Sequence, residues 1–313
     1  MDIQSKIILI SGPTASGKSH LAVKLAKRIN GEIINADSMQ VYKQLKILTA
    51  RPNSNEKKGI KHHLYGIIDV NKNFSTGEWL KLATKKIKEI RQRKKIPILV
   101  GGTGLYFQCL INGLVKIPNI PIKIRNKVRL IQKKDGQKRF YKKLLKLDIK
   151  SQNKFDSNDS QRTIRAYEIK LYTKISMYDW LNKTKPQFKE NEFFKLYINV
   201  DRQQLIKRIS NRSITMFRDG VVKEIKRFNN QKIKKDNSVN KVIGIDELKK
   251  HLKDQLTLDE ARDLISIRTR QYAKRQATWA RSRMSSWNKI SPNEISIWIK
   301  KINKSTLKLD QLI

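Results

Sequence analysis

The sequence predicts an α/β fold in which an all-helical domain is inserted into a parallel-sheet core. Short, mostly apolar runs that are typical of buried strands lie at residues 7–10, 96–100 and 194–200. Helical patterns separate them, as in βαβ units, and the first of these helices is expected at residues 21–29. A glycine-rich segment joins the first strand to this helix, which is the arrangement of a phosphate-binding α/β core.

The insertion is predicted from a change in character between residues 116 and 189. Strand patterns disappear there, charged residues become more frequent, and Pro118 and Pro121 mark the entrance. We therefore expect a core made of residues 1–115 and 190–313, interrupted by a helical domain.

The glycine-rich segment fits the P-loop pattern GxxxxGK[ST] at every fixed position. In such a loop, backbone N–H groups surround phosphate oxygens, and the helix N-terminus adds its positive end. Lys18 can reach the terminal phosphates and the Ser19 hydroxyl can hold Mg²⁺. A simple turn that starts a helix is the alternative, but strand and helix on the correct sides disfavour it. The sequence thus predicts a P-loop NTPase-like core whose di- or triphosphate site is formed by Gly12, Pro13, Thr14, Ala15, Ser16, Gly17, Lys18 and Ser19.

Composition narrows the class of protein further. The chain of 313 residues has 69 Lys and Arg against 27 Asp and Glu, a formal net charge of +42. Such a surplus attracts polyanions, nucleic acid above all, although lysine is abundant throughout the chain and weakens this argument. The single cysteine, Cys109, excludes a disulfide framework. We find neither a signal-peptide pattern nor an apolar run of membrane-spanning length, and therefore expect a soluble, cytoplasmic protein.

Two short segments are expected near the phosphate loop, because the carboxyl ends of parallel strands line the ligand crevice. Asp37 follows a predicted strand at residues 31–35, where it can assist Mg²⁺, act as a base or cap the next helix. Thr103 lies in a Gly-Gly-Thr-Gly turn after the strand at residues 96–100, and its hydroxyl can donate to a phosphate oxygen. A motor ATPase or GTPase usually has a carboxylate at this second position, and here there is none.

Arginines at helical spacing are candidates for phosphate contacts. Arg162 and Arg165 lie three residues apart in the insertion, although a solvated basic face fits this spacing equally well. Arg208 and Arg212 lie on a helix predicted at residues 203–216, from which either could neutralise charge at the P-loop.

The last long helix starts at Thr257, in a Thr-Leu-Asp-Glu capping box. Along it, Arg268, Tyr272, Arg275 and Trp279 recur every three or four residues on one side. Interleaved cations and rings suit a sugar-phosphate backbone with exposed bases. Aromatic residues at helical spacing are more often part of a core, but the many cations of this helix argue against burial of the whole face. The residues after this helix, with Trp287 and Trp298, are expected to form a small terminal appendage.

Further motifs complete the pattern: Asp37-Ser38-Met39-Gln40-Val41-Tyr42, Thr49-Ala50-Arg51-Pro52, His62-His63-Leu64, Asp159-Ser160-Gln161-Arg162, and the helix segment at residues 269–281. Together with the P-loop and the glycine turn, they resemble the bacterial-type tRNA dimethylallyltransferases, also called tRNA isopentenyltransferases. The resemblance extends to about residue 283 in the family's order. The first motif and the Thr-Arg-Gln-Tyr-Ala-Lys-Arg-Gln stretch are far more specific than the P-loop.

The resemblance implies transfer of a dimethylallyl group from dimethylallyl diphosphate to N6 of adenosine 37 of certain tRNAs. The P-loop would hold the donor's diphosphate, with Mg²⁺ near Ser19. Thr103 would contact the oxygen that joins C1 to the diphosphate, and Arg212 would neutralise the diphosphate's charge. Asp37 would take a proton from N6.

The same resemblance implies a set of tRNA contacts around the adenine and the anticodon stem-loop. They would be made by Asp37, Ser38, Met39, Gln40, Thr103, Arg125, Gln161, Arg162, Thr163, Ile164, Arg165, Val242, Ile243, Gly244, Lys274, Arg275, Gln276, Trp279 and Arg281. Three positions depart from the family's usual residues: Leu48 and Lys174 replace glycines, and Ile245 replaces a tyrosine.

Two other functions share parts of this pattern. A P-loop kinase of a nucleoside or small metabolite would have the same core, but would consume ATP and have no need for the basic last helix. A non-catalytic RNA-binding module would use the P-loop as a nucleotide sensor. Nothing in the sequence requires more than a monomer.

Overall fold

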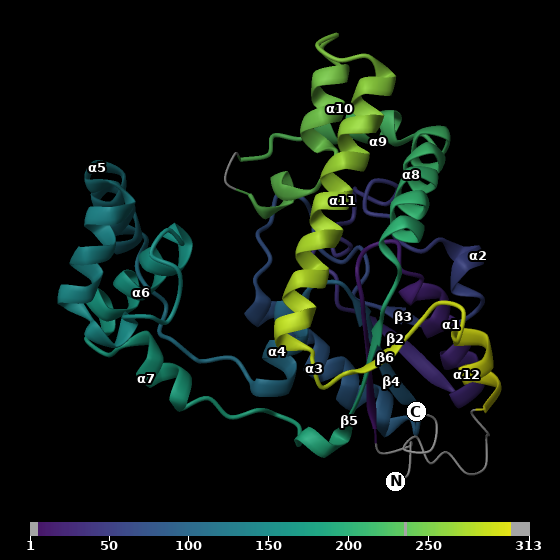
Figure 1. Cartoon of the computed structure of the whole chain (residues 1–313), viewed down its shortest axis with the longest axis horizontal. Coiled ribbons are helices and arrows are strands. Elements are labelled where there is room, and N and C mark those ends of the chain that lie inside the picture. Colours follow the sequence, from purple (N-terminus) through teal and green to yellow (C-terminus); the bar gives the residue numbers. More distant parts are fainter. Residues whose placement is uncertain (1–5, 235–236, 302–313) are drawn as a thin grey trace. The chain divides into compact units, whose positions relative to one another are not determined.

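The computed structural model describes residues 6–234 and 237–301, and the chain divides into two compact units (Figure 1). The core unit comprises Met1–Ile111 and Phe188–Ile313, and the inserted unit comprises Asn112–Gln187. The sequence predicts the insertion at residues 116–189, so both of its ends lie a few residues earlier in the chain than expected.

In the described part of the core unit, six strands form one parallel sheet in the order β3-β2-β4-β1-β5-β6. The strands are β1 (Ile7–Ser11), β2 (Gly31–Asn35), β3 (His62–His63), β4 (Ile96–Gly101), β5 (Phe193–Ile198) and β6 (Asn288–Ile290). β1 is central, and its Ile8 pairs with Ile98 on one side and Phe194 on the other. Every residue of β1 and β4 is buried, which explains why both strands are almost continuously apolar.

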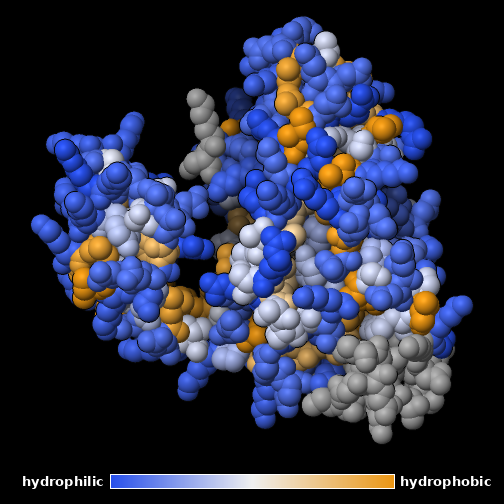
Figure 2. All heavy atoms as spheres, in the orientation of Figure 1, coloured by the Kyte–Doolittle hydropathy of each residue, from blue (hydrophilic) through white to orange (hydrophobic). Residues whose placement is uncertain are grey.

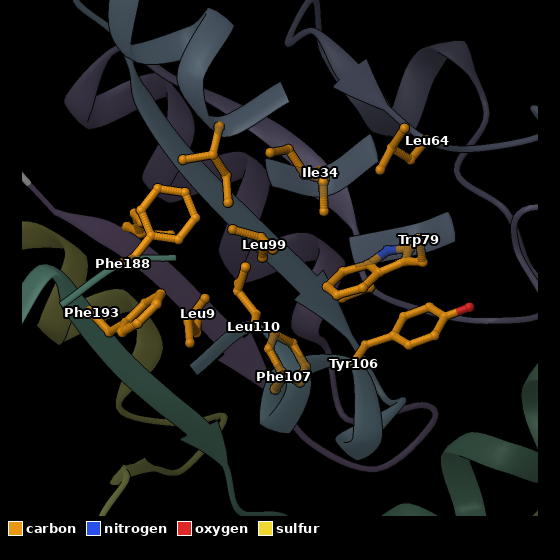
Figure 3. Packing of buried hydrophobic residues seen from close by; sticks show 14 of the residues in the cluster. Leu9, Ile34, Leu64, Trp79, Leu99, Tyr106, Phe107, Leu110, Phe188 and Phe193 are labelled. Carbon is orange, nitrogen blue, oxygen red and sulfur yellow. The ribbon is translucent and has the colours of Figure 1, made fainter. Parts of the chain in front are cut away.

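Helices cover both faces of this sheet. The helices of the core unit are α1 (Lys18–Ile29), α2 (Ser54–Lys57), α3 (Thr76–Gln92), α4 (Gly104–Asn112), α8 (Arg202–Arg218), α9 (Val221–Asn229), α10 (Ile245–His251), α11 (Leu258–Arg283) and α12 (Ile295–Lys301), with short 3-10 turns at Glu190–Glu192 and Ser238–Lys241. Alternate residues of β1 face opposite sides: Ile8 packs with α1 and α12, whereas Leu9 packs with α3 and α4. Figure 3 shows the second of these clusters, in which Trp79 and Phe107 lie beside Leu9 and Leu99.

A third hydrophobic cluster joins helices α8, α9, α10 and α11 to the segment that follows β2. Val41 and Leu45 of this segment pack with Met216, Ile225 and Leu248. The cluster therefore holds the long helix α11 and the segment after β2 in one body with the sheet.

The end of β2 is fixed by α3. Ser75 and Glu78 form a capping box that starts this helix at Thr76. The buried Trp79 then donates from Nε1 to the Asn35 carbonyl at 2.8 Å, and its ring stacks on Tyr106 with centroids 4.2 Å apart. Trp79 thus fixes the backbone at the end of β2, from which the segment with Asp37 begins.

The C-terminal residues that follow α11 are part of the sheet core. The sequence predicts a small terminal appendage containing Trp287 and Trp298, and this prediction is wrong for the described residues. β6 pairs with β5, and Trp298 of α12 stacks on Phe194 with centroids 6.3 Å apart. Both tryptophans are buried.

The inserted unit is helical. Its helices are α5 (Ile122–Leu147), α6 (Ser160–Thr173) and α7 (Met177–Asn182), with a 3-10 turn at Ile149–Ser151. Gly136, at φ 73°, interrupts α5 with a kink. Phe140 and Leu144 of α5 are fully buried, as are Ala166 and Ile169 of α6. The buried Asp148 carboxylate accepts hydrogen bonds from the hydroxyls of Ser151 and Ser176.

The surface of both units is mainly hydrophilic on the face that Figure 2 shows. Within residues 6–234 and 237–301, no helix combines the length and the apolar character needed to cross a membrane.

Candidate active site

The phosphate loop connects β1 to α1 and is open at its centre. Gly12 (φ 156°) cannot carry a side chain, because a Cβ atom there would lie 3.0 Å from the Ile198 carbonyl oxygen and 2.9 Å from Ser16 Oγ. Gly17 starts α1 in the left-handed region at φ 95°. The Ser16 hydroxyl is buried and has no hydrogen-bond partner among the described residues, so it is available to a phosphate oxygen. The first N–H groups of a helix have no partner within it, so those at the start of α1 are free to bind an anion at this loop.

Lys18 is half-buried and donates to the Pro13 carbonyl at 2.8 Å. The pKa of this ammonium is lowered to about 8, chiefly by burial; the Asp37 carboxylate opposes this shift, and the positive charge of Arg212 adds to it. Burial also lowers the pKa of Arg212, again against the charge of Asp37. Lys18, Asp37 and Arg212 therefore form one group of interacting charges.

Of the two arginines that the sequence leaves open, Arg212 belongs to this charged group. Arg208, one turn earlier on α8, donates instead to the Ser16 carbonyl at 3.2 Å and supports the backbone of the phosphate loop.

Asp37 does not cap a helix, which corrects one of the three interpretations that the sequence allows. Its Oδ1 accepts from the Met39 N–H at 2.9 Å in a tight turn, and the next helix, α2, begins only at Ser54. Asn35 holds this turn from below, because its side-chain oxygen accepts from the Asp37 N–H at 2.9 Å. The remaining interpretations are a base and a group that assists Mg²⁺.

The glycine turn after β4 is forced by close packing. A Cβ atom at Gly101 would lie 2.0 Å from the Ala36 carbonyl oxygen, and one at Gly104 would lie 2.2 Å from the Trp279 ring. Thr103 Oγ1 accepts from the Ser38 N–H at 3.0 Å and donates to the Ser38 hydroxyl at 3.3 Å. The turn thus places Thr103 directly beside the residues that follow Asp37.

Gln276 of α11 joins the two loops. Its Oε1 accepts from the Thr14 N–H at 2.8 Å, and its Nε2 donates to the Gly102 carbonyl at 2.9 Å. The resemblance assigns Gln276 to the tRNA, but both ends of its amide group bind the protein. Gln40 likewise binds the protein: its Nε2 donates to the carbonyls of Thr49 and Ala50, each at 2.9 Å.

Three tyrosines near Asp37, of which Tyr106 is buried and Tyr65 and Tyr272 are half-buried, are site residues that the sequence does not single out as a group. Burial and the charge of Asp37 both raise the pKa of Tyr65, Tyr106 and Tyr272, so their hydroxyls stay neutral. Tyr272 is recognisable as part of the α11 face, and the Arg275 guanidinium lies 5.7 Å from its ring centroid. Tyr65 and Tyr106 carry no local pattern that predicts their place.

A cavity of about 280 Å³, partly open to solvent, lies beside these elements. It is lined by predicted site residues from five separate segments: Thr14, Asp37, Met39, Arg212, Val242, Ile243 and Arg275. Leu48, Thr49 and Tyr272 add to its wall. The 242–244 loop is held in place by Glu247, which accepts from the Gly244 N–H at 3.1 Å and pairs with Arg268 Nε at 2.7 Å.

Other predicted residues of α11 face elsewhere. Lys274 and Arg281 line a second cavity of about 490 Å³ between α8 and α11. Trp279 is half-buried and packs against the cluster under α4. The helix thus presents cations on more than one side.

The remaining predicted tRNA contacts lie on α5 and α6 of the inserted unit. Gln161 and Arg162 are exposed, with Arg162 paired to Asp159 at 3.2 Å, while Ile164 is half-buried. Arg165 Nη1 lies 3.5 Å from a Glu168 carboxylate oxygen, and Arg125 Nη2 donates to Asn119 at 3.5 Å. Thr163 is fully buried and donates to the Asp159 carbonyl, so its side chain supports the unit's own fold.

The adjacent histidines are not arranged as a metal site. His63 Nε2 lies 2.7 Å from a Glu32 oxygen, and His62 Nδ1 lies 2.8 Å from the Ile60 carbonyl. In the described ranges, no group of three or more His, Cys, Asp and Glu side chains is placed to hold a metal ion.

Thr14 of the phosphate loop, Asp37 and the half-buried Arg212 share the wall of one cavity, as expected of a P-loop α/β transferase. Residues 40–283 match the model of the IPP transferase family, and the chain belongs to this family.

Named relatives and solved structures agree with this membership. The tRNA dimethylallyltransferase of Pelagibacter ubique (strain HTCC1062) is 68% identical over 312 residues, 100% of each chain. That of Rickettsia massiliae (strain Mtu5) is 45% identical and covers 90% of this chain and 78% of its own. The tRNA isopentenylpyrophosphate transferase of Bacillus halodurans is similar in structure, with a TM-score of 0.67, 32% identity and 95% of both chains covered. A eukaryotic dimethylallyltransferase acting on tRNA has a TM-score of 0.81 at 31% identity and covers 94% of this chain and 75% of its own.

Proposed function

We propose that the protein transfers a dimethylallyl group from dimethylallyl diphosphate to N6 of adenosine 37 in tRNA and releases diphosphate. The observation that carries this proposal is the meeting of Thr14 of the phosphate loop, Asp37 and Arg212 in the wall of one cavity. Relatives that cover 90% and 100% of the chain are named tRNA dimethylallyltransferases, and the kinase alternative is therefore not favoured.

The chemistry needs a base because an exocyclic amine is a weak nucleophile whose lone pair is delocalised into the adenine ring. Asp37 is the carboxylate in the cavity wall, and it would accept the N6 proton as the C–N bond forms. Its turn, fixed through Asn35 and the Met39 N–H, aims the carboxylate before substrate arrives.

The larger contribution is expected from neutralising the diphosphate as it leaves. Lys18 and Arg212 would supply positive charge for this, and the buried Ser16 hydroxyl, which has no partner among the described residues, and N–H groups of the loop would donate to the diphosphate oxygens. Thr103, held through Ser38, would contact the oxygen that joins C1 to the diphosphate.

The phosphate loop also suits Mg²⁺. This ion usually keeps several waters and binds one or two protein groups together with substrate phosphates. The exposed Ser19 hydroxyl, one residue into α1, is such a group, so Ser19 would hold the ion beside the diphosphate. Bound there, Mg²⁺ would supply additional positive charge toward the leaving group.

Adenosine 37 would have to leave its stack to enter the cavity, which costs relatively little in a single-stranded loop. Arg275 and the 242–244 loop line the cavity, and Lys274 and Arg281 lie on the neighbouring side of α11. We propose that these groups grip the anticodon stem-loop together with the arginines of the inserted unit. A cytoplasmic monomer is the simplest working form.

The decisive experiment incubates the protein with tRNA and prenyl-labelled dimethylallyl diphosphate. Label should enter the RNA, and Asp37→Ala should lower the rate by about 10²–10⁴-fold while tRNA affinity is kept. Asp69→Ala is the matched control, because Asp69 Oδ1 accepts from the N–H two residues ahead at 2.9 Å in the same way, but the residue does not line the cavity. Near-normal turnover in Asp37→Ala would disprove the base assignment. ATP consumption without labelled RNA would favour a kinase.

A further inference from the structure

We call the cavity of about 280 Å³ lined by Asp37 and Arg212 the reacting cavity. A buried carboxylate that does not line it accepts hydrogen bonds from three consecutive backbone amides. Glu224 of α9 is 9% exposed. Its Oε1 accepts from the N–H groups of Lys46 and Ile47 at 2.7 and 2.8 Å, and its Oε2 accepts from the Leu48 N–H at 2.9 Å. Hydrogen bonds to an ionised acceptor are roughly twice as strong as neutral ones, so this side chain contributes strongly to fixing the segment, alongside the turn bonds from the Ala50 N–H to the Ile47 carbonyl and from the Thr49 hydroxyl to the Leu45 carbonyl.

The segment that Glu224 holds separates two cavities. Leu48 and Thr49 line the reacting cavity. Their neighbours Ile47 and Ala50 line a larger cavity of about 830 Å³ on the other side. We call this segment, residues 46–50, the partition. Arg212 lines both cavities, so the two cavities come closest to each other beside Arg212.

The partition is held from the other side by weaker contacts. Gln40 donates to the carbonyls of Thr49 and Ala50 at 2.9 Å. Leu48 packs closely over Gly244, where a Cβ atom would lie 2.5 Å from its Cδ1. These contacts seat the segment but leave the amides of residues 46–48 to Glu224.

We propose that Glu224 is a positioning residue that keeps this partition closed and thereby excludes water from the prenyl donor. The inference rests on the proposed function. Without the carboxylate, the three amides would turn toward water, Leu48 and Thr49 would shift, and the two cavities would join beside Arg212.

Water in the joined cavity would compete with adenosine for the donor. The bond between C1 and the diphosphate oxygen would break, and a water oxygen would bond to C1. The water proton would pass to solvent, giving dimethylallyl alcohol and diphosphate. The diagnostic quantity is therefore the ratio of diphosphate released to adenosine modified.

The experiment measures this ratio and the transfer rate in Glu224→Ala and Glu224→Gln. The wild type should show a ratio near one. Glu224→Ala should lose about 10²-fold in transfer rate, because a displacement of about 1 Å at a distance can cost that much, and its ratio should rise above one. Glu224→Gln should be intermediate, since its amide oxygen can still accept from two of the three N–H groups.

Glu32→Gln is the matched control. Glu32 is a buried carboxylate that pairs with His63, Arg93 and Lys95, but it lines neither cavity. This variant should be less stable, yet keep the wild-type ratio per folded molecule. A ratio that stays near one in both Glu224 variants, or an equal rise in Glu32→Gln, overturns the proposal. A wild type that modifies no tRNA would instead refute the proposed function.

Discussion

Lys18 carries its charge where water reaches only part of its side chain. Its pKa is lowered from 10.5 to about 8, chiefly by burial. The folded protein therefore loses this proton at lower pH than the unfolded chain does, and the contribution of Lys18 to the free energy of unfolding rises between these two values. A diphosphate needs the charged form, so binding should restore the proton.

This predicts a pH dependence of donor affinity. Between pH 7 and 9 the dissociation constant for dimethylallyl diphosphate should rise about tenfold, because binding at the higher pH must take up a proton. Lys18→Met should bind the donor more weakly at pH 7 and show little dependence on pH. Titration calorimetry without tRNA measures both proteins. An unchanged pH slope in Lys18→Met would assign the effect to another group.

At this scale the sequence predicts what lies within one motif. Thr14 and Asp37 are identified by local patterns, whereas helical spacing alone leaves Arg208 and Arg212 equivalent; Thr14, Asp37 and Arg212 line one cavity. Gln276 is different, because its partner Gly102 lies 174 residues away in the chain. Helical spacing shows that Gln276 is on α11 but not what packs against it. The same holds for Tyr65 and for Glu224.

Helix α11 is the element that orders the site. It contacts the phosphate loop through Gln276 and the glycine turn through Trp279, while Arg275 lines the cavity. Its position relative to the sheet is therefore set in part at Gly104, where the Trp279 ring leaves no room for a methyl group.

Gly104→Ala tests this contact. Gly104 is not in the left-handed region, so alanine adds no backbone strain, but its Cβ would lie 2.2 Å from the ring. The free energy of unfolding should fall by about 1–3 kcal/mol. With Trp279→Ala in the same chain, the alanine should cost little more. Urea unfolding of the four proteins of this cycle measures the coupling. Additive losses would show that the two residues do not compete for space.

Long elements are predictable from the sequence and short ones are not. The capping box at Thr257 starts α11 as expected, because capping depends on residues within one turn. β6 has three residues, too few for any periodicity to register, and only pairing with β5 makes it a strand. The break in α5 at Gly136 is likewise invisible to a pattern that continues on both sides.

The whole molecule carries a net charge of +42, so any polyanion should bind it to some degree. Specific binding of tRNA by the cations of α11 must therefore be distinguished from non-specific electrostatic binding of polyanions. Lys274→Ala combined with Arg275→Ala should weaken tRNA binding and reduce the magnitude of the slope of log affinity against log salt concentration by about 1.4–1.8, because each phosphate contact contributes about 0.7–0.9.

The control removes the same charge elsewhere. Lys81 and Lys88 are exposed on α3, and the double alanine variant has the same net charge as the α11 variant. Filter binding over a range of salt concentrations compares the two. Equal slopes would mean that the two α11 cations contact phosphate no more than any other lysine does.

The division into units is also readable from the sequence, because strand patterns stop where the insertion begins. The contacts between distant segments that close the cavity are not, since they depend on the third hydrophobic cluster, which joins residues from Val41 to Ile265.

The central strand has a consequence for how the chain comes into being. β1 is synthesised before the other described strands of the sheet, yet one of its two neighbours, β5, starts only at Phe193. Until β5 is synthesised, the second edge of β1 has unpaired amides and carbonyls, which can pair with a strand of another chain and cause aggregation. The inserted unit is made of near-neighbour helices and is complete before that edge is covered. The nascent polypeptide must therefore carry an unfinished sheet through most of its translation.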